Sequence, residues 1–145
     1  MRRPSRNLTT LVAKVTEETR KRLEETVGEA AAWLEWVAHG AAGAEGCVVC
    51  ESKVRTEGNH VAGRRHGDLV VPMCTNCHGR FSKAQYTWDP RWQGEEPSAA
   101  LDESLMILGL ALLCEERAYY RGPAYLELAD RLRGTYWACA QGTIP

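Results

Sequence analysis

The sequence has no strong excess of charge of either sign, no long apolar run and no repeat. Its 145 residues carry a formal net charge of -1, which excludes a basic surface over the whole protein. The longest apolar stretch, residues 105–114, is about half as long as a membrane span. No apolar run follows the basic residues 1–6, as it would in a signal peptide. We therefore expect a cytoplasmic protein with no membrane partner.

Cysteine is present in a pattern that favours metal binding. Two C-x2-C pairs, Cys47 with Cys50 and Cys74 with Cys77, are separated by 23 residues. In a reducing compartment, paired cysteines are more often metal ligands than disulfides. The two cysteines of a pair can bind the same ion from a tight turn. Two such pairs together supply the four thiolates of one tetrahedral site. The sequence therefore predicts a structural Zn²⁺ ion bound by these four cysteines.

Other interpretations of the cysteines are weaker. Cys74-Thr-Asn-Cys77-His78 matches the C-x-x-C-H string of haem attachment, but that attachment needs an exported setting and would leave Cys47 and Cys50 unused. A thioredoxin-like pair at Cys47 and Cys50 would need a βαβ pattern around it, which is absent. Four unrelated buried thiols are the plain structural alternative.

The N-terminal segment, residues 1–46, predicts one long helix and a linker. Apolar side chains recur at helical spacing over residues 7–38. Gly28 is a position at which this helix could bend or divide. The linker, residues 39–46, contains three glycines, which end a helix readily.

The C-terminal segment, residues 94–145, predicts two more helices. Ser98 is the expected N-cap of the first, which is apolar almost all round its middle and therefore buried. Gly122 and Pro123 should end it and start a shorter helix that runs to Arg133, before Gly134. The helical segments at both ends also offer a surface for a homodimer, as an alternative to a monomer.

The middle segment, residues 47–93, contains most of the chemistry. It predicts strands at 54–60 and 69–73, a loop at 62–68 and a helix at 75–85, so the expected fold class is α+β. It has seven basic and four acidic side chains, a net charge of +3, while the rest of the chain carries -4. Any basic surface is therefore local.

In this segment the sequence resembles the HNH endonucleases, a branch of the ββα-metal (His-Me finger) nucleases. The matching motifs are Cys47-x-x-Cys50, Asn59-His60-Val61-Ala62-Gly63-Arg64 and Cys74-Thr-Asn-Cys77-His78, over roughly 45 of 145 residues. The stretch that follows, with Trp88 and Trp92, is similar to small bacterial and phage members. The resemblance implies a small ββα-metal core with a structural zinc, flanked by the N- and C-terminal helices.

The resemblance also implies a set of catalytic roles. Phosphodiester hydrolysis needs an activated water and a cation on the phosphate. By resemblance, His60 is the general base, and Asn59 with His78 holds one divalent cation, Mg²⁺, Mn²⁺ or another. The family commonly has Asp or His where Asn59 stands, and an amide oxygen is a weaker ligand than a carboxylate. His66 falls where the family has a loop-bracing asparagine.

The expected partner is DNA, and the expected phosphate contacts are Arg64, Arg65, Arg80 and Lys83, since guanidinium forks suit phosphate oxygens. The sequence thus favours a metal-dependent endonuclease. Two alternatives stay open because Asn59 and His66 depart from the common motif and the overall charge is near zero. One is a nucleic-acid-binding module of the same fold that cuts weakly or not at all. The other is a structural protein in which zinc only stabilises the core.

Overall fold

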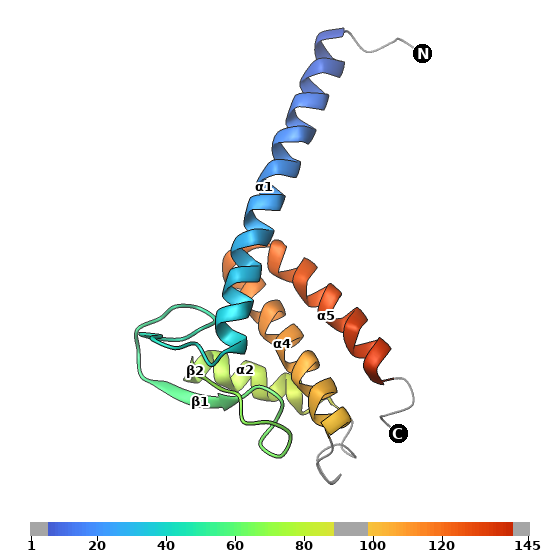
Figure 1. Ribbon diagram of the computed structural model, residues 1–145. Coiled ribbons are helices and arrows are strands. Elements are labelled where there is room, and N and C mark those ends of the chain that lie inside the picture. Colours follow the sequence, from blue (N-terminus) through green and yellow to red (C-terminus); the bar gives the residue numbers. More distant parts are fainter. Residues whose placement is uncertain (1–5, 89–98, 141–145) are drawn as a thin grey trace.

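A computed structural model describes residues 6–88 and 99–140 of the chain. Helices surround a small two-stranded sheet, so the predicted α+β class is confirmed (Figure 1). Ser98, Trp92 and the predicted boundary between residues 93 and 94 lie outside the described residues. The elements, in chain order, are α1 (Arg6–Ala38), β1 (Thr56–His60), β2 (Val70–Cys74), α2 (Thr75–Gln85), α4 (Ala99–Arg121) and α5 (Ala124–Ala140).

The two strands form an antiparallel hairpin, and α2 follows β2 without a linker. Glu57 pairs with Met73 and Asn59 with Val71. In a two-stranded sheet both strands are edges, so Pro72 is tolerated although it has no N–H to donate. Its carbonyl oxygen accepts a hydrogen bond of 3.0 Å from the backbone N–H of Val48. This bond ties the segment with the first cysteine pair to the hairpin.

One hydrophobic cluster joins all three parts of the chain. Trp33 and Val37 enter it from α1, and Phe81 enters it from α2. Phe81 is fully buried, and burial of such a side chain contributes about 1.5–3 kcal/mol. The sequence predicts a buried helix in the region of α4, and this prediction is confirmed. The buried side chains of α4 include Leu101, Leu105, Leu108, Leu112 and Leu113. No helix within the described residues is long and apolar enough to cross a membrane.

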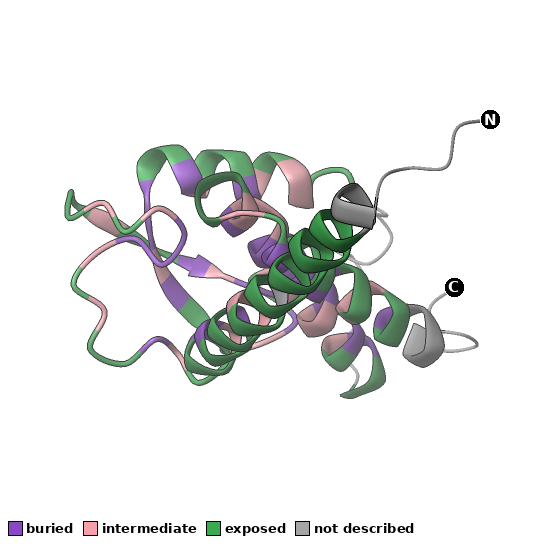
Figure 2. Ribbon diagram, turned by 90° about the horizontal axis from the view of Figure 1, so that it is seen from above, coloured by how far each residue is buried: buried purple, intermediate pink, exposed green. Residues whose placement is uncertain are grey.

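Only the C-terminal end of α1 packs against the rest of the protein. Ala30, Trp33 and Val37 are buried there, whereas the preceding turns are exposed and extend away from the body (Figures 1 and 2). The helix is continuous through Gly28, so the predicted division into two helices is not observed.

The predicted break between α4 and α5 is confirmed at Gly122. Its φ of 104° lies in the left-handed region, which is typical of the residue that follows a helix. Its N–H donates to the carbonyl of Ala118 at 2.9 Å. The predicted end of α5 near Gly134 is wrong, because α5 continues to Ala140. Gly134 is exposed and meets no steric obstacle, so it is accommodated as an ordinary helical residue.

Candidate functional site

The four predicted zinc ligands come together in one cluster. The Sγ atoms of Cys47, Cys50, Cys74 and Cys77 all lie within 4.8 Å of one another. Cys50 Sγ and Cys74 Sγ are 3.7 Å apart. Two thiolates on one tetrahedral zinc, with Zn–S bonds of about 2.3 Å, are separated by about 3.8 Å. The cluster can therefore hold a metal ion, and its spacing suits zinc.

A tight turn presents the first pair of cysteines. The N–H of Glu51 donates to the carbonyl of Cys47 at 2.9 Å, and the N–H of Cys47 donates to the carbonyl of Ser52 at 3.0 Å. Gly46 makes this closure possible, because a Cβ on Gly46 would lie 2.4 Å from the carbonyl oxygen of Ser52. Any side chain at position 46 would thus open the turn.

The second pair lies at the junction of β2 and α2. Cys74 ends β2 and is also the N-cap of α2, where its Sγ accepts from the backbone N–H of Cys77 at 3.5 Å. Burial opposes ionisation of Cys74, but hydrogen bonds from Cys77 and the neighbouring thiols outweigh it and lower the pKa of Cys74. Burial raises the pKa of Cys77. The cluster therefore favours ionisation of one thiol while disfavouring that of its neighbour.

The outer helices support the first pair directly. Arg117 of α4 is buried, and its Nη1 donates to the carbonyl of Val49 at 2.6 Å. Its guanidinium also lies over the ring of Trp33, 5.3 Å from the centroid, and Nη2 is 3.1 Å from Glu51. The Trp33 indole donates to the carbonyl of Val48 at 3.0 Å. Helices far away in sequence thus hold the turn that carries Cys47 and Cys50.

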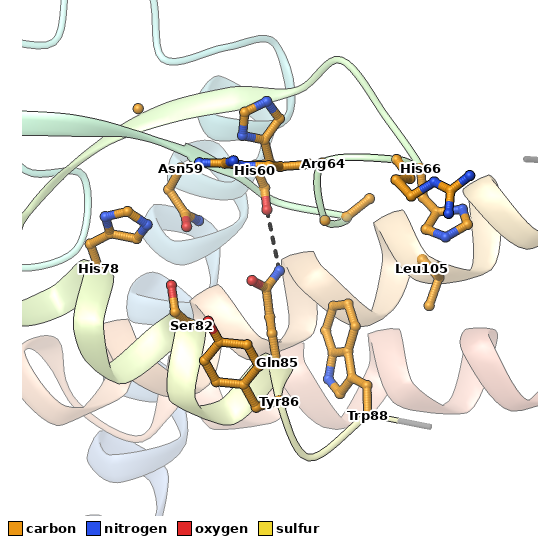
Figure 3. A pocket seen from close by; sticks show the side chains of 14 residues that line it. Asn59, His60, Arg64, His66, His78, Ser82, Gln85, Tyr86, Trp88 and Leu105 are labelled. Atoms are coloured by element: carbon orange, nitrogen blue, oxygen red, sulfur yellow. Dashed lines mark hydrogen bonds between the residues drawn. The ribbon is translucent and has the colours of Figure 1, made fainter. Parts of the chain in front are cut away.

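A cleft of about 600 Å³ opens between β1, the loop that connects β1 to β2, and α2, with Leu105 of α4 at its edge (Figure 3). In Figure 3, Asn59, His78 and Ser82 lie toward one end of this cleft, and Trp88 and Leu105 lie toward the other. His66 lies beside Leu105 at the second end, so polar side chains are present at both ends of the cleft. The predicted site residues that line it are Asn59, His60, Arg64, Arg65, His66 and His78.

Asn59 and His60 end β1, and successive side chains on a strand point to opposite faces. In Figure 3 the Asn59 amide points toward α2, while the His60 ring lies on the other side of the strand. Asn59 is only 2% exposed, and its Nδ2 has no hydrogen-bond partner. Gln85 donates from Nε2 to the carbonyls of His60 and Val61, at 3.2 Å each. Gln85 thus fixes the backbone of the strand end, a role that the sequence did not indicate.

Carboxylates hold the other two histidines of the cleft. His78, in the first turn of α2, has its Nδ1 2.6 Å from Oε2 of Glu57 on β1. His66 is buried, and its Nδ1 is 2.8 Å from Oδ1 of Asp102 on α4. The second pair ties the loop that carries Arg64 to α4. Both carboxylates were missed from the sequence.

The remaining two predicted phosphate contacts lie outside the cleft lining. Arg80 faces α4, where its Nη2 is 3.2 Å from Glu116 and donates to the Tyr120 hydroxyl at 3.0 Å. Its guanidinium also stands 5.1 Å from the centroid of the Tyr119 ring. Lys83 is exposed on α2. Arg64 and Arg65 are therefore the two cations that the fold brings beside the histidines.

Comparison with known proteins adds no family to this geometry. No protein-family model, curated protein or solved structure matches the chain.

Proposed function

We propose that this protein is a metal-dependent HNH-type endonuclease that hydrolyses DNA phosphodiester bonds with His60 as the general base. The observation that carries the proposal is the cleft, whose lining includes His60, Asn59 and His78 together with Arg64 and Arg65. These are the groups that phosphodiester hydrolysis needs, namely a base, cation ligands and phosphate contacts. In this proposal β1, β2 and α2 form a ββα-metal core.

The thiol cluster has a structural role in the proposal, as the site of a Zn²⁺ ion. It contains four cysteines, and structural zinc sites use four protein ligands, whereas catalytic ones keep a position open. Cys77 directly precedes His78, and Cys74 caps the same helix. Zinc bound there would fix the start of α2 and so the position of His78.

Asn59 and His78 fit the proposed cation by their donor chemistry. Asn59 presents a buried amide with an unpartnered Nδ2, and a half-turn of the amide would bring Oδ1 to the same place. His78 offers an imidazole nitrogen from α2 across the cleft. A divalent cation held there stabilises the charge that develops on the phosphate.

The other steps belong to residues of the chain. A neutral imidazole at His60 accepts the proton of the attacking water. Arg64 and Arg65, on the loop beside it, bind the phosphate oxygens through their guanidinium forks. The His66–Asp102 contact at 2.8 Å holds that loop against α4. The loop is thus positioned before DNA binds.

One observation favours a second candidate, a nucleic-acid-binding module of the same fold that does not cut. Asn59 is neutral, and hard divalent cations prefer carboxylate ligands. Such a module would keep the arginines and the thiol cluster while the cation site stays empty.

The test combines cleavage with binding. Zinc-loaded protein is incubated with supercoiled plasmid in the presence of Mg²⁺ or Mn²⁺, and its affinity for a DNA duplex is measured over a range of salt concentrations. Cleavage that requires the cation supports the endonuclease. Salt-sensitive binding without cleavage supports the binding module. Absence of both leaves a structural role and defeats both candidates.

A further inference from the structure

We infer that Glu57 is a positioning residue for the proposed cation site, holding the His78 imidazole so that Nε2 is its ligand atom. The inference rests on the proposed function, because it assigns His78 to a divalent cation. Glu57 is not one of the residues that line the cleft and is not part of the matching motifs. Its role follows from a contact that the fold creates.

The contact between Glu57 and His78 is short. Oε2 of Glu57 is 2.6 Å from Nδ1 of His78, and the imidazole side chain is 29% exposed. An ionised carboxylate can only accept a hydrogen bond, so Nδ1 must carry the proton. In a neutral imidazole the lone pair then lies on Nε2. The pair thus selects one tautomer of His78.

The position of Glu57 follows from the strand. Glu57 and Asn59 are two residues apart on β1, so their side chains lie on the same face. The register pairs Glu57 with Met73, and Cys74, which follows Met73, caps α2. The hairpin and the helix cap therefore fix the distance between Glu57 and the first turn of α2. We call Glu57, Asn59 and His78 one group, because Glu57 contacts His78, and His78 and Asn59 line the same cleft.

This group supplies a charge that Asn59 lacks. A carboxylate that accepts from the remote nitrogen of a ligating histidine fixes the ring orientation and makes the ligand nitrogen more basic. The neutral amide of Asn59 contributes no charge to the site. Glu57 contributes one through the imidazole ring of His78. The carboxylate that the family commonly places on the cation would thus act here through the histidine.

The experiment compares wild type with Glu57→Ala and with the conservative Glu57→Asp. Glu29→Ala is the matched control, since Glu29 is an exposed carboxylate on α1. Zinc content and circular dichroism verify folding. The tautomer of His78 is read at pH 8 without added cation, from the ¹⁵N shifts and long-range couplings of its ring. Binding of Mn²⁺ is measured by electron paramagnetic resonance, with His78→Ala marking the signal that belongs to this site.

In wild type and Glu29→Ala we expect the Nδ1–H tautomer and Mn²⁺ binding that depends on His78. In Glu57→Ala we expect the loss of that tautomer preference and a fall in Mn²⁺ affinity of about 10- to 100-fold. Glu57→Asp should recover part of both. The inference is overturned if Glu57→Ala keeps the tautomer and the affinity of wild type, or if wild type binds no Mn²⁺ through His78.

The same experiment separates this inference from the proposed function. Wild type that binds Mn²⁺ in the manner expected but does not cleave DNA supports the role of Glu57 and defeats the endonuclease. Cleavage by both wild type and Glu57→Ala at equal rates, with equal Mn²⁺ affinity, overturns the role of Glu57 and leaves the endonuclease standing.

Discussion

Gly109 of α4 lies against the carbonyl group of Val61, so closely that a Cβ on Gly109 would stand 2.0 Å from the Val61 oxygen. Val61 directly follows His60, and its carbonyl also accepts from Gln85. One small residue thus lets α4 pack against the end of the strand that carries the proposed base. The position of α4 and the shape of the cleft depend on this contact.

Gly109→Ala should therefore destabilise the protein, although alanine usually stabilises a helix. The obstacle is backbone, which cannot rotate away, so we expect a loss of at least about 1–3 kcal/mol in the free energy of unfolding. Urea denaturation measures the change. The control is Gly28→Ala, because a Cβ there meets nothing within 4 Å. It should gain about 0.5–1 kcal/mol. Equal stability of the two variants would contradict the close packing of α4.

Removal of the proposed zinc ion should disorder the part of the protein that carries the site. We expect one zinc ion per chain, bound by the four clustered thiols. Cys77→Ser should abolish zinc binding and loosen the start of α2, because it removes one of the four clustered thiols, and Cys77 lies in the first turn of that helix. Cys114→Ala should retain zinc. Metal analysis and amide hydrogen exchange over residues 74–85 provide the measurement, and full zinc content in Cys77→Ser would refute the assignment.

Cys114 should resist alkylation in the folded protein. Its side chain is fully buried on α4, and this burial raises its pKa to about 12. Alkylation requires the thiolate, which at pH 8 is present at a fraction of about 10⁻⁴ for such a pKa. In urea the pKa returns to about 8.5 and the thiol should react readily. Peptide mapping after iodoacetamide treatment tests this, and rapid labelling of Cys114 in native protein would count against its burial.

Arg117→Met should weaken both the fold and zinc retention. The buried guanidinium donates to the carbonyl of Val49 and lies 5.3 Å from the Trp33 ring centroid. Hydrogen bonds that involve a charged group contribute about 1.5–3 kcal/mol, and the abandoned carbonyl adds a desolvation cost. Arg131→Met removes only an exposed pair with Glu127 and should cost at most about 0.5 kcal/mol.

Urea denaturation and the rate of zinc transfer to a chromogenic chelator compare the two arginine variants. Faster transfer from Arg117→Met alone is the expected result. Equal transfer rates would mean that α4 does not support the turn with Cys47 and Cys50.

Local sequence patterns predicted much of the fold. The order of strands and helices follows from short-range periodicity, and α2 has the predicted bounds. The two cysteine pairs could be predicted to meet because a tetrahedral zinc site needs four ligands and each pair supplies two. Two glycines were expected to interrupt helices, but α1 continues through Gly28 and α5 through Gly134. Gly28 and Gly134 are exposed helical residues, where glycine costs only about 1 kcal/mol, too little to end a helix.

Contacts between distant segments could not be predicted. The His66–Asp102 contact joins a loop to a helix 36 residues later, and the Arg117–Val49 bond spans 68 residues. Neither contact produces a recognisable pattern in the local sequence. Glu57 is different, because it lies two residues before Asn59 on the predicted strand. Side chains two residues apart on a strand lie on the same face. That pattern could have marked Glu57 as a neighbour of the site.

Nicking of supercoiled plasmid by wild type and His60→Ala, matched for zinc content, tests the central claim most directly. His39→Ala is the control, because His39 follows α1 and is absent from the cleft lining. With Mg²⁺ or Mn²⁺, wild type and His39→Ala should nick at the same rate. His60→Ala should be slower by about 10²- to 10⁴-fold, the contribution of a general base. Absence of cleavage by folded, zinc-loaded wild type, or undiminished cleavage by His60→Ala, would contradict it.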